Sequence, residues 1–113
     1  MRCWVRFHIP IRLPSLSNTR LDWRAMATLK RKQKAATSIC MKFAEKCPTP
    51  PLTVTITRVG PRKLDDDNLA AAAKYVRDQI AAIVGVDDGS PLYTWVYRQQ
   101  IGEYGVDVEV TAR

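Results

Sequence analysis

The sequence predicts a single α+β or α/β domain in which helices pack against one mixed sheet, and three observations support this prediction. The 113 residues match the usual length of one domain, so residues 1–113 are expected to share a single hydrophobic core. Four stretches alternate between apolar and polar residues, which is the period of a half-buried strand. Two longer stretches place apolar residues three or four positions apart, which is the period of a helix packed on one face. The predicted order is therefore β-α-β-α-β-β, with two main helices.

The first part of the chain predicts a strand at residues 3–11 and a helix from about residue 22 to residue 46. In the strand, Val5 and Phe7 fall on the inward side, whereas Arg6 falls on the outward side. A loop rich in proline, serine and asparagine separates the two elements. The helix residues expected in the core are Met26, Leu29, Ala36, Ile39, Cys40 and Phe43.

The second part predicts a strand at residues 52–58, a helix at residues 68–84 and two further strands. Gly85 follows the helix, where a left-handed glycine commonly ends it. The last two strands, residues 92–99 and 106–111, are expected to form an antiparallel hairpin. The apolar stripe of the helix comprises Leu69, Ala73, Val76, Ile80 and Ile83.

Basic and acidic residues are divided unevenly along the chain. Residues 1–64 hold 14 Lys or Arg against 2 Asp or Glu, a net charge of +12, whereas residues 65–113 hold 4 against 9, a net charge of −5. A basic half suits the phosphate backbone of nucleic acid, which an acidic cluster repels unless a divalent cation is bound. For the basic residues of the first helix, a solvated surface is the alternative. The residues expected to contact nucleic acid are Lys30, Arg31, Lys32, Lys34, Arg58, Arg62 and Lys63.

Histidine and cysteine usage excludes several classes of enzyme. Cys3, Cys40 and Cys47 form no CxxC pair, so neither a zinc site nor a disulfide framework is expected. His8 is the only histidine and lies in a strand pattern, which argues against a Ser/His/Asp site. Arginines interrupt the apolar stretches near the N-terminus, so neither a signal peptide nor a membrane-spanning segment is expected. The expected location is therefore the cytoplasm.

Two acidic clusters flank the second predicted helix. Asp65, Asp66 and Asp67 precede it, and in an extended lead-in the first and third of these project to the same side. Helix capping is the alternative for this cluster. Asp87 and Asp88 follow the helix, and a turn is their alternative role. A helix of this length spans about 25 Å, so its two ends cannot share a metal ion unless the chain returns on itself.

The two acidic motifs resemble those of RusA-type Holliday-junction resolvases. The matching segments are residues 65–69, which read Asp-Asp-Asp-Asn-Leu, and residues 84–88, which read Val-Gly-Val-Asp-Asp. Residues 13–18 are similar to the family's Pro-Ser-x-Asn loop, with one extra residue. The resemblance implies a homodimer that cuts four-way DNA junctions with Mg²⁺ in each subunit. It also implies metal ligands at Asp65, Asp67 and Asp88, with Asn68 and Asp87 in supporting positions.

One position departs from the family pattern. The family has a lysine where this chain has Ala71, and Lys74 lies three residues further along the predicted helix, close enough to replace it. Two alternatives to a junction nuclease remain, namely a DNA-binding module that has lost cleavage and an unrelated basic RNA-binding protein.

The alternating aromatic residues of the third strand are expected to pack against the core, with base stacking as the alternative. These residues are Tyr93, Trp95 and Tyr97.

Overall fold

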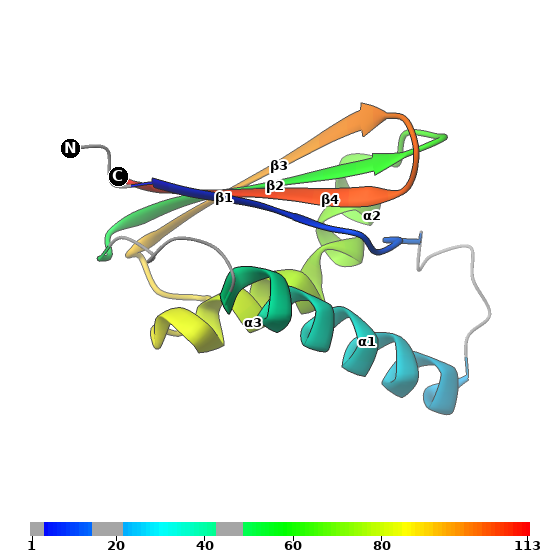
Figure 1. Cartoon of the computed structure of the whole chain (residues 1–113), viewed down its shortest axis with the longest axis horizontal. Helices are drawn as coiled ribbons and strands as arrows, with labels where there is room; N and C mark the ends of the chain where they lie inside the picture. Colours follow the sequence, from blue (N-terminus) through cyan, green and yellow to red (C-terminus); the bar gives the residue numbers. More distant parts are fainter. Residues whose placement is uncertain (1–3, 15–21, 43–48) are drawn as a thin grey trace.

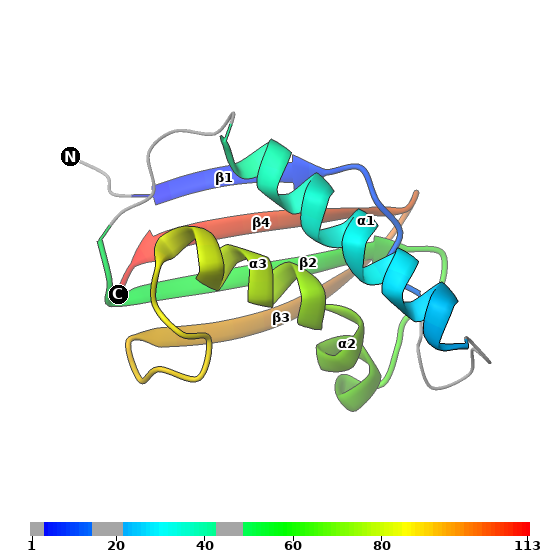
Figure 2. The ribbon, with the colours of Figure 1, turned by 90° about the horizontal axis from the view of Figure 1, so that it is seen from below.

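A sheet with all of its helices on one side forms the fold of the computed structural model, which describes residues 4–14, 22–42 and 49–113. Figure 1 shows the helices as one layer beneath the strands, and Figure 2 shows this layer from below, so the opposite face of the sheet carries no helix from the described residues. The predicted α+β class is confirmed. The elements are β1 (Trp4–Ile9), α1 (Trp23–Lys42), β2 (Leu52–Gly60), α2 (Asp66–Ala72), α3 (Lys74–Val84), β3 (Tyr93–Ile101) and β4 (Gly105–Ala112).

The strands lie in the order β1-β4-β2-β3, so the predicted hairpin of the last two strands is wrong. Strand β2 lies between them, parallel to β3 and antiparallel to β4. The connection at residues 102–104 crosses the end of β2, where the Gly102 N–H donates to the Gly60 carbonyl at 3.0 Å. It must span two strand spacings of about 4.8 Å each, which a tight two-residue turn does not. Strand β3 is consequently one edge of the sheet, and β1 is the other.

Alternation along the strands decides which side chains enter the core. On β2, every second residue from Leu52 to Gly60 is buried, and the intervening threonines are half-buried on the open face. The inward and outward sides predicted for the first strand are confirmed, because Val5 and Phe7 are buried while Arg6 is exposed. From the helical layer, α3 and the residue before it contribute most to the apolar core, with Ala73, Val76, Ile80 and Ala81. Leu69 and Ala72 on α2 and Met41 on α1 are buried as well.

The buried face of α1 differs from the one predicted. Ile39 is 57% exposed, whereas Gln33 and Thr37 are buried. Each polar side chain donates to a backbone carbonyl: Thr37 Oγ1 to that of Gln33 at 2.7 Å, and Gln33 Nε2 to that of Arg12 at 3.5 Å. Gln33 Oε1 is buried without a hydrogen-bond partner among the described residues. Met26, Leu29, Ala36 and Cys40 are half-buried, and Phe43 lies outside the described residues, as do residues 15–18 of the loop before the helix.

The helix predicted at residues 68–84 is two helices, α2 and α3, separated at Ala73. Ala73 has φ −86° and ψ −3°, near the edge of the right-handed helical region, and Figure 2 shows α2 and α3 running in different directions on its two sides. Gly85 ends α3 as predicted: its φ is +88°, and its N–H donates to the Ala81 carbonyl at 2.9 Å. Among the described residues, no helix has the length and apolar character needed to cross a membrane.

Candidate metal and nucleic-acid site

The first acidic cluster lies exposed at the start of α2. Asp65 is the residue before the helix, with φ −63° and ψ 157°, and its backbone carbonyl accepts the Leu69 N–H at 2.8 Å. Its carboxylate makes no capping hydrogen bond, so side-chain capping does not account for this aspartate. Asp66 and Asp67 occupy the first turn and are exposed as well. Their carboxylates are therefore accessible to a ligand.

A side-chain amide ties this cluster to the sheet. Gln99 on β3 accepts the Leu64 N–H at 2.7 Å through Oε1 and donates to the Leu64 carbonyl at 2.7 Å through Nε2. The Gln99 amide thus pairs with the backbone N–H and C=O of Leu64, the residue directly before Asp65, as a neighbouring strand would. This contact fixes the entry to α2 beside the C-terminal half of β3. Gln99 could not be predicted as part of the site from the sequence, because a glutamine on a strand carries no local signal of a distant backbone partner.

The second acidic cluster is tied to the other end of the same strand. Trp95 Nε1 donates to the Asp88 carbonyl at 2.9 Å, and the Tyr93 hydroxyl donates to the Val86 carbonyl at 2.8 Å. Asp87 Oδ2 accepts the Gly89 N–H at 3.0 Å, which confirms a turn role for this residue. The aromatic side chains of β3 pack against the core, as predicted in preference to base stacking.

The structure does not bring the two acidic clusters together within one chain. In Figure 2, α2 lies near one end of β3, and the loop that follows α3 lies near the other. Helix α3 has 11 residues and spans about 16 Å between them. In the part of the chain that the structure describes, no group of three or more His, Cys, Asp or Glu is placed to hold a metal ion. The carboxylates have the chemistry that Mg²⁺ requires, but a single chain does not gather Asp65, Asp67 and Asp88 around one ion.

Arg58 is not the nucleic-acid contact that the sequence predicted. It is only 4% exposed, and its guanidinium donates to the Leu13 carbonyl through Nε and to the Arg62 carbonyl through Nη1, each at 2.7 Å. Burial lowers the pKa of the Arg58 guanidinium below its ordinary value, Tyr104 acts in the opposite direction, and Arg12 adds to the lowering. The guanidinium remains charged, because arginine does not lose its proton in proteins. Arg58 therefore joins two loops and does not face solvent.

Two other predicted contacts stand next to the first acidic cluster. Arg62 and Lys63 are exposed in the segment between β2 and α2. At the same end of the sheet, the Arg12 guanidinium carbon lies 4.7 Å from the centre of the Tyr104 ring. Arg62 and Lys63 thus directly precede the carboxylates at the start of α2, and Arg12 adds a third cation at the same end of the sheet. Such a surface attracts phosphates to that point.

The remaining basic residues belong to the middle of α1 and the start of α3. Lys30, Arg31 and Lys32 are exposed, and Lys34 is half-buried. Lys30 Nζ lies 6.0 Å from the centre of the Tyr75 ring on α3. Lys74 is exposed as the first residue of α3. The break at Ala73 separates it from Ala71 on α2, so the expectation that both share one continuous helix is wrong.

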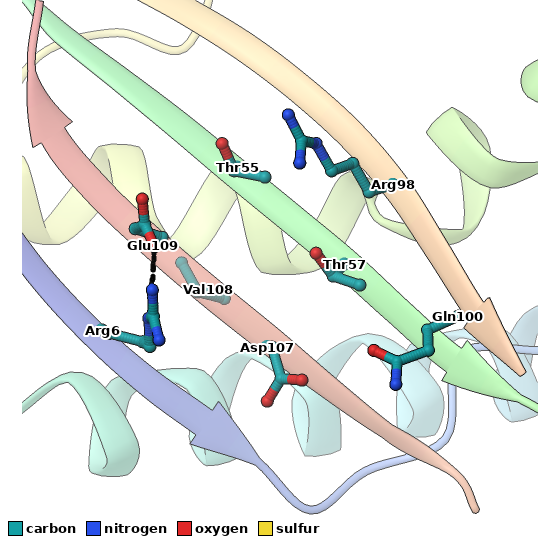
Figure 3. Close-up of a pocket in the computed structure, with 8 residues that line it drawn as sticks. All are labelled: Arg6, Thr55, Thr57, Arg98, Gln100, Asp107, Val108 and Glu109. Atoms are coloured by element: carbon teal, nitrogen blue, oxygen red, sulfur yellow. Dashed lines mark hydrogen bonds and ion pairs between the residues drawn. The ribbon is translucent and has the colours of Figure 1, made fainter. Parts of the chain in front are cut away.

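The face of the sheet without helices carries a shallow depression of about 420 Å³, drawn in Figure 3. There, Arg6 Nη2 lies 2.6 Å from Glu109 Oε2, and Arg98 extends from β3 toward β2. Asp107 Oδ1 lies 2.7 Å from His8 Nδ1. Both acidic residues of the depression are held by a basic neighbour, and the predicted metal carboxylates lie elsewhere. The lining residues are Arg6, Thr55, Thr57, Arg98, Gln100, Asp107, Val108 and Glu109.

Comparison with protein-family models, with curated proteins and with solved structures finds no match to this chain. The resemblance to RusA-type resolvases therefore rests on the two acidic motifs.

Proposed function

We propose that this protein is a Mg²⁺-dependent, structure-specific endodeoxyribonuclease that cuts four-way DNA junctions as a homodimer. The observation that carries the proposal is that both acidic clusters are tied to one edge strand. Leu64 and Gln99 fix the first cluster beside the C-terminal half of β3, and Trp95 fixes Asp88 beside the N-terminal half. An edge strand presents unpaired backbone groups, which suit pairing with a second chain.

Antiparallel pairing of two copies along β3 would complete the site. With Tyr97 at the two-fold axis, Trp95 lies opposite Gln99 of the partner subunit. Asp88 of one subunit then comes beside the segment that carries Asp65 in the other. Each dimer holds two such sites related by symmetry, as paired nicks on a two-fold junction require.

The residue types suit phosphodiester hydrolysis. A bound Mg²⁺ supplies an activated water and neutralises charge on the scissile phosphate. Arg62 and Lys63, directly before the carboxylates, hold the DNA backbone at the site. Lys74 is a further candidate cation, exposed at the start of α3. The predicted cytoplasmic location stays a prediction.

Mixed dimers test the shared site. Asp67→Asn and Asp88→Asn subunits carrying different tags are co-expressed, and the heterodimer is purified over both tags. One of its two sites then has both substitutions, whereas the other has neither. We expect this heterodimer to nick a labelled four-way junction with Mg²⁺, while each homodimeric variant is inactive.

The matched control combines Asp65→Asn with Asp67→Asn subunits. Both substitutions lie in the same half of the site, so each site of this heterodimer contains one of them, and no nicking is expected. An Asp67→Asn/Asp88→Asn heterodimer as inactive as this control would show that the carboxylates are not shared between subunits.

A DNA-binding module without cleavage is the second candidate. It is favoured by the absence, among the described residues of one chain, of a group of three ligands around a metal position. A parent protein that binds the junction tightly but does not nick it at any Mg²⁺ concentration would support this candidate. Tighter binding to single-stranded or duplex RNA than to the junction would instead favour an RNA-binding protein.

A further inference from the structure

Helix α1 turns a row of three basic side chains toward solvent. We propose that this basic row, formed by Arg24, Arg31 and Lys42, is a docking surface for the phosphate backbone of duplex DNA. The inference rests on the proposed function in one respect, which is that the duplex is an arm of the four-way junction. Of the four α1 residues that the sequence predicts as nucleic-acid contacts, only Arg31 belongs to the row.

The charge of α1 is all of one sign. The helix contains six lysines and arginines and no aspartate or glutamate. Within the part of the chain that the structure describes, none of the six forms an ion pair. The aspartate directly before the helix, Asp22, is occupied as a cap, because its Oδ1 accepts the Ala25 N–H at 2.8 Å. The positive charge of α1 therefore suits a polyanionic partner.

The buried face of the helix shows which cations stand furthest from the core. Gln33 is buried on that face. At 100° per residue, Arg24, Arg31 and Lys42 fall within about 20° of one line along the helix, and this line lies opposite Gln33. All three residues are exposed. Figure 1 also shows the N-terminal end of α1 further from the sheet than its C-terminal end, so the row is accessible along its length.

The length of the row suits a duplex. At 1.5 Å per residue, it extends about 27 Å from Arg24 to Lys42. A duplex presents one phosphate charge per about 1.7 Å of its axis, or about 16 charges over that length. Ala27 and Ala35 are exposed between the cations, and their short side chains leave the longer basic ones projecting beyond them. Each cation of the row is thus able to meet a phosphate.

The other cations of α1 lie about 80° or more from the row. Lys30 Nζ lies 6.0 Å from the centre of the Tyr75 ring on α3. Lys34 follows on the same side and is half-buried, whereas Lys32 lies on the opposite flank and is exposed. These three lysines carry the same total charge as the row on the same helix. They therefore provide a comparison in which only the direction of the charge differs.

An anionic membrane is the other partner that a basic helix fits, provided that the helix has an apolar face to insert. The apolar side of α1 is directed toward the core, where Met41 is buried. The large apolar residues that α1 exposes are Trp23 and Ile39, and they lie about 24 Å apart along the helix axis. The Arg24 guanidinium carbon lies 5.2 Å from the centre of the Trp23 ring. Because these two residues form no continuous apolar face, duplex DNA is favoured.

Two triple variants test the row by removing the same charge from different sides of α1. The row variant is Arg24→Gln/Arg31→Gln/Lys42→Gln, and the flank variant is Lys30→Gln/Lys32→Gln/Lys34→Gln. The affinity of each for a labelled DNA duplex is measured at several salt concentrations without Mg²⁺. We expect the row variant to reduce the slope of log affinity against log salt by about 2 to 3, and the flank variant by about 1 or less.

A conservative variant separates charge from folding. Arg24→Lys/Arg31→Lys keeps both charges and should keep the slope of the parent, because a phosphate contact counts by its charge. Circular dichroism of all variants measures whether α1 remains helical. Equal reductions of the slope in the row and flank variants, or no reduction in the row variant, would overturn the inference. Tighter binding to vesicles containing phosphatidylserine than to the duplex, lost in the row variant, would overturn it in favour of a membrane.

The proposed function is decided by a separate measurement, the nicking of a four-way junction with Mg²⁺. A parent that binds the duplex through the row but does not nick the junction leaves the inference standing and overturns the nuclease. A parent that nicks the junction, beside a row variant with an unchanged slope, supports the nuclease and overturns the inference.

Discussion

At the scale of single residues, the three aspartates at the start of α2 have different roles in the proposed function. The sequence predicts that Asp65 and Asp67 project together and that Asp66 points away from them. All three are exposed, and Asp65 makes no capping contact. Cleavage of a DNA junction should therefore depend on which of the three carboxylates is removed, and not on the total charge of the cluster.

We expect Asp67→Asn to abolish cleavage of a four-way junction while leaving junction binding within about twofold of the parent. A metal ligand stabilises charge that develops in the transition state, whereas cations elsewhere hold the DNA backbone. Single-turnover cleavage and gel-shift titration measure the two effects separately. Asp66→Asn is the control, since it removes the same charge from the neighbouring position and should cleave nearly as the parent does. Equal losses in both variants would contradict the metal assignment.

Arg58 should contribute to stability and not to DNA binding. Arg58→Met removes the donors to two backbone carbonyls, that of the buried Leu13 and the part-buried one of Arg62. We expect the free energy of unfolding to fall by about 2 to 4 kcal/mol, because hydrogen bonds from charged groups are strong and unsatisfied acceptors are costly. Urea denaturation measures this quantity. Arg31→Met, at an exposed arginine of α1, should change it by less than about 0.5 kcal/mol.

At the scale of secondary-structure elements, the basic residues of α1 surround much of the helix. At 100° per residue, Lys32 lies almost half a turn from Lys34, and Lys30 lies beside a tyrosine of α3. A phosphate backbone cannot contact all sides of the helix at once. The number of phosphates that this element neutralises is therefore a measurable quantity.

Replacing Lys30, Arg31, Lys32 and Lys34 together by glutamine should flatten the slope of log affinity against log salt. Each lost phosphate contact reduces the slope by about 0.9, so a change of about 3 to 4 would mean that all four contact DNA. Junction affinity at several salt concentrations gives the slope. Arg62→Gln/Lys63→Gln is the comparison, and should reduce it by about 2. An unchanged slope in the α1 variant would identify its lysines and arginine as a solvated surface.

At the scale of the whole molecule, the edge strand β3 predicts the assembly. We expect sedimentation equilibrium to give twice the 12.8 kDa of the chain. We also expect a Val96→Cys/Arg98→Cys variant to form an interchain disulfide on oxidation. With Tyr97 on the two-fold axis, these two positions oppose each other at about 5 Å between Cα atoms, which a disulfide can bridge.

The control for the cross-link is Thr55→Cys/Thr57→Cys, at the same spacing and on the same face of the inner strand β2. It should form no interchain disulfide, because β3 covers that edge of β2. A dimer in sedimentation without cross-linking of the β3 variant would show that the chains associate elsewhere. A monomer that still resolves junctions would contradict the dimer altogether.

The sequence by itself determined the fold class, the order of the strands along the chain and the inward side of the first two strands, because strand alternation and glycine geometry act over a few residues. Gly85 and the buried positions of β2 are examples. The burial of Arg58 was also available from the sequence, since it continues the alternation of Leu52, Val54 and Ile56. Its charge suggested a surface position instead, and one of the two carbonyls that accept from the guanidinium, that of Leu13, comes from a distant segment.

Only the tertiary structure decided how the elements meet. The insertion of β2 between β3 and β4, the break at Ala73 and the buried face of α1 each depend on contacts between residues far apart in the sequence. The same holds for the candidate site. The sequence supplied its carboxylates at both ends of a helix, but their attachment to the two ends of β3 through Gln99 and Trp95 depends on side-chain hydrogen bonds that no local pattern encodes. In the proposed function, a complete site requires a second chain, because β3 has no neighbour on its outer side among the strands that the structure describes.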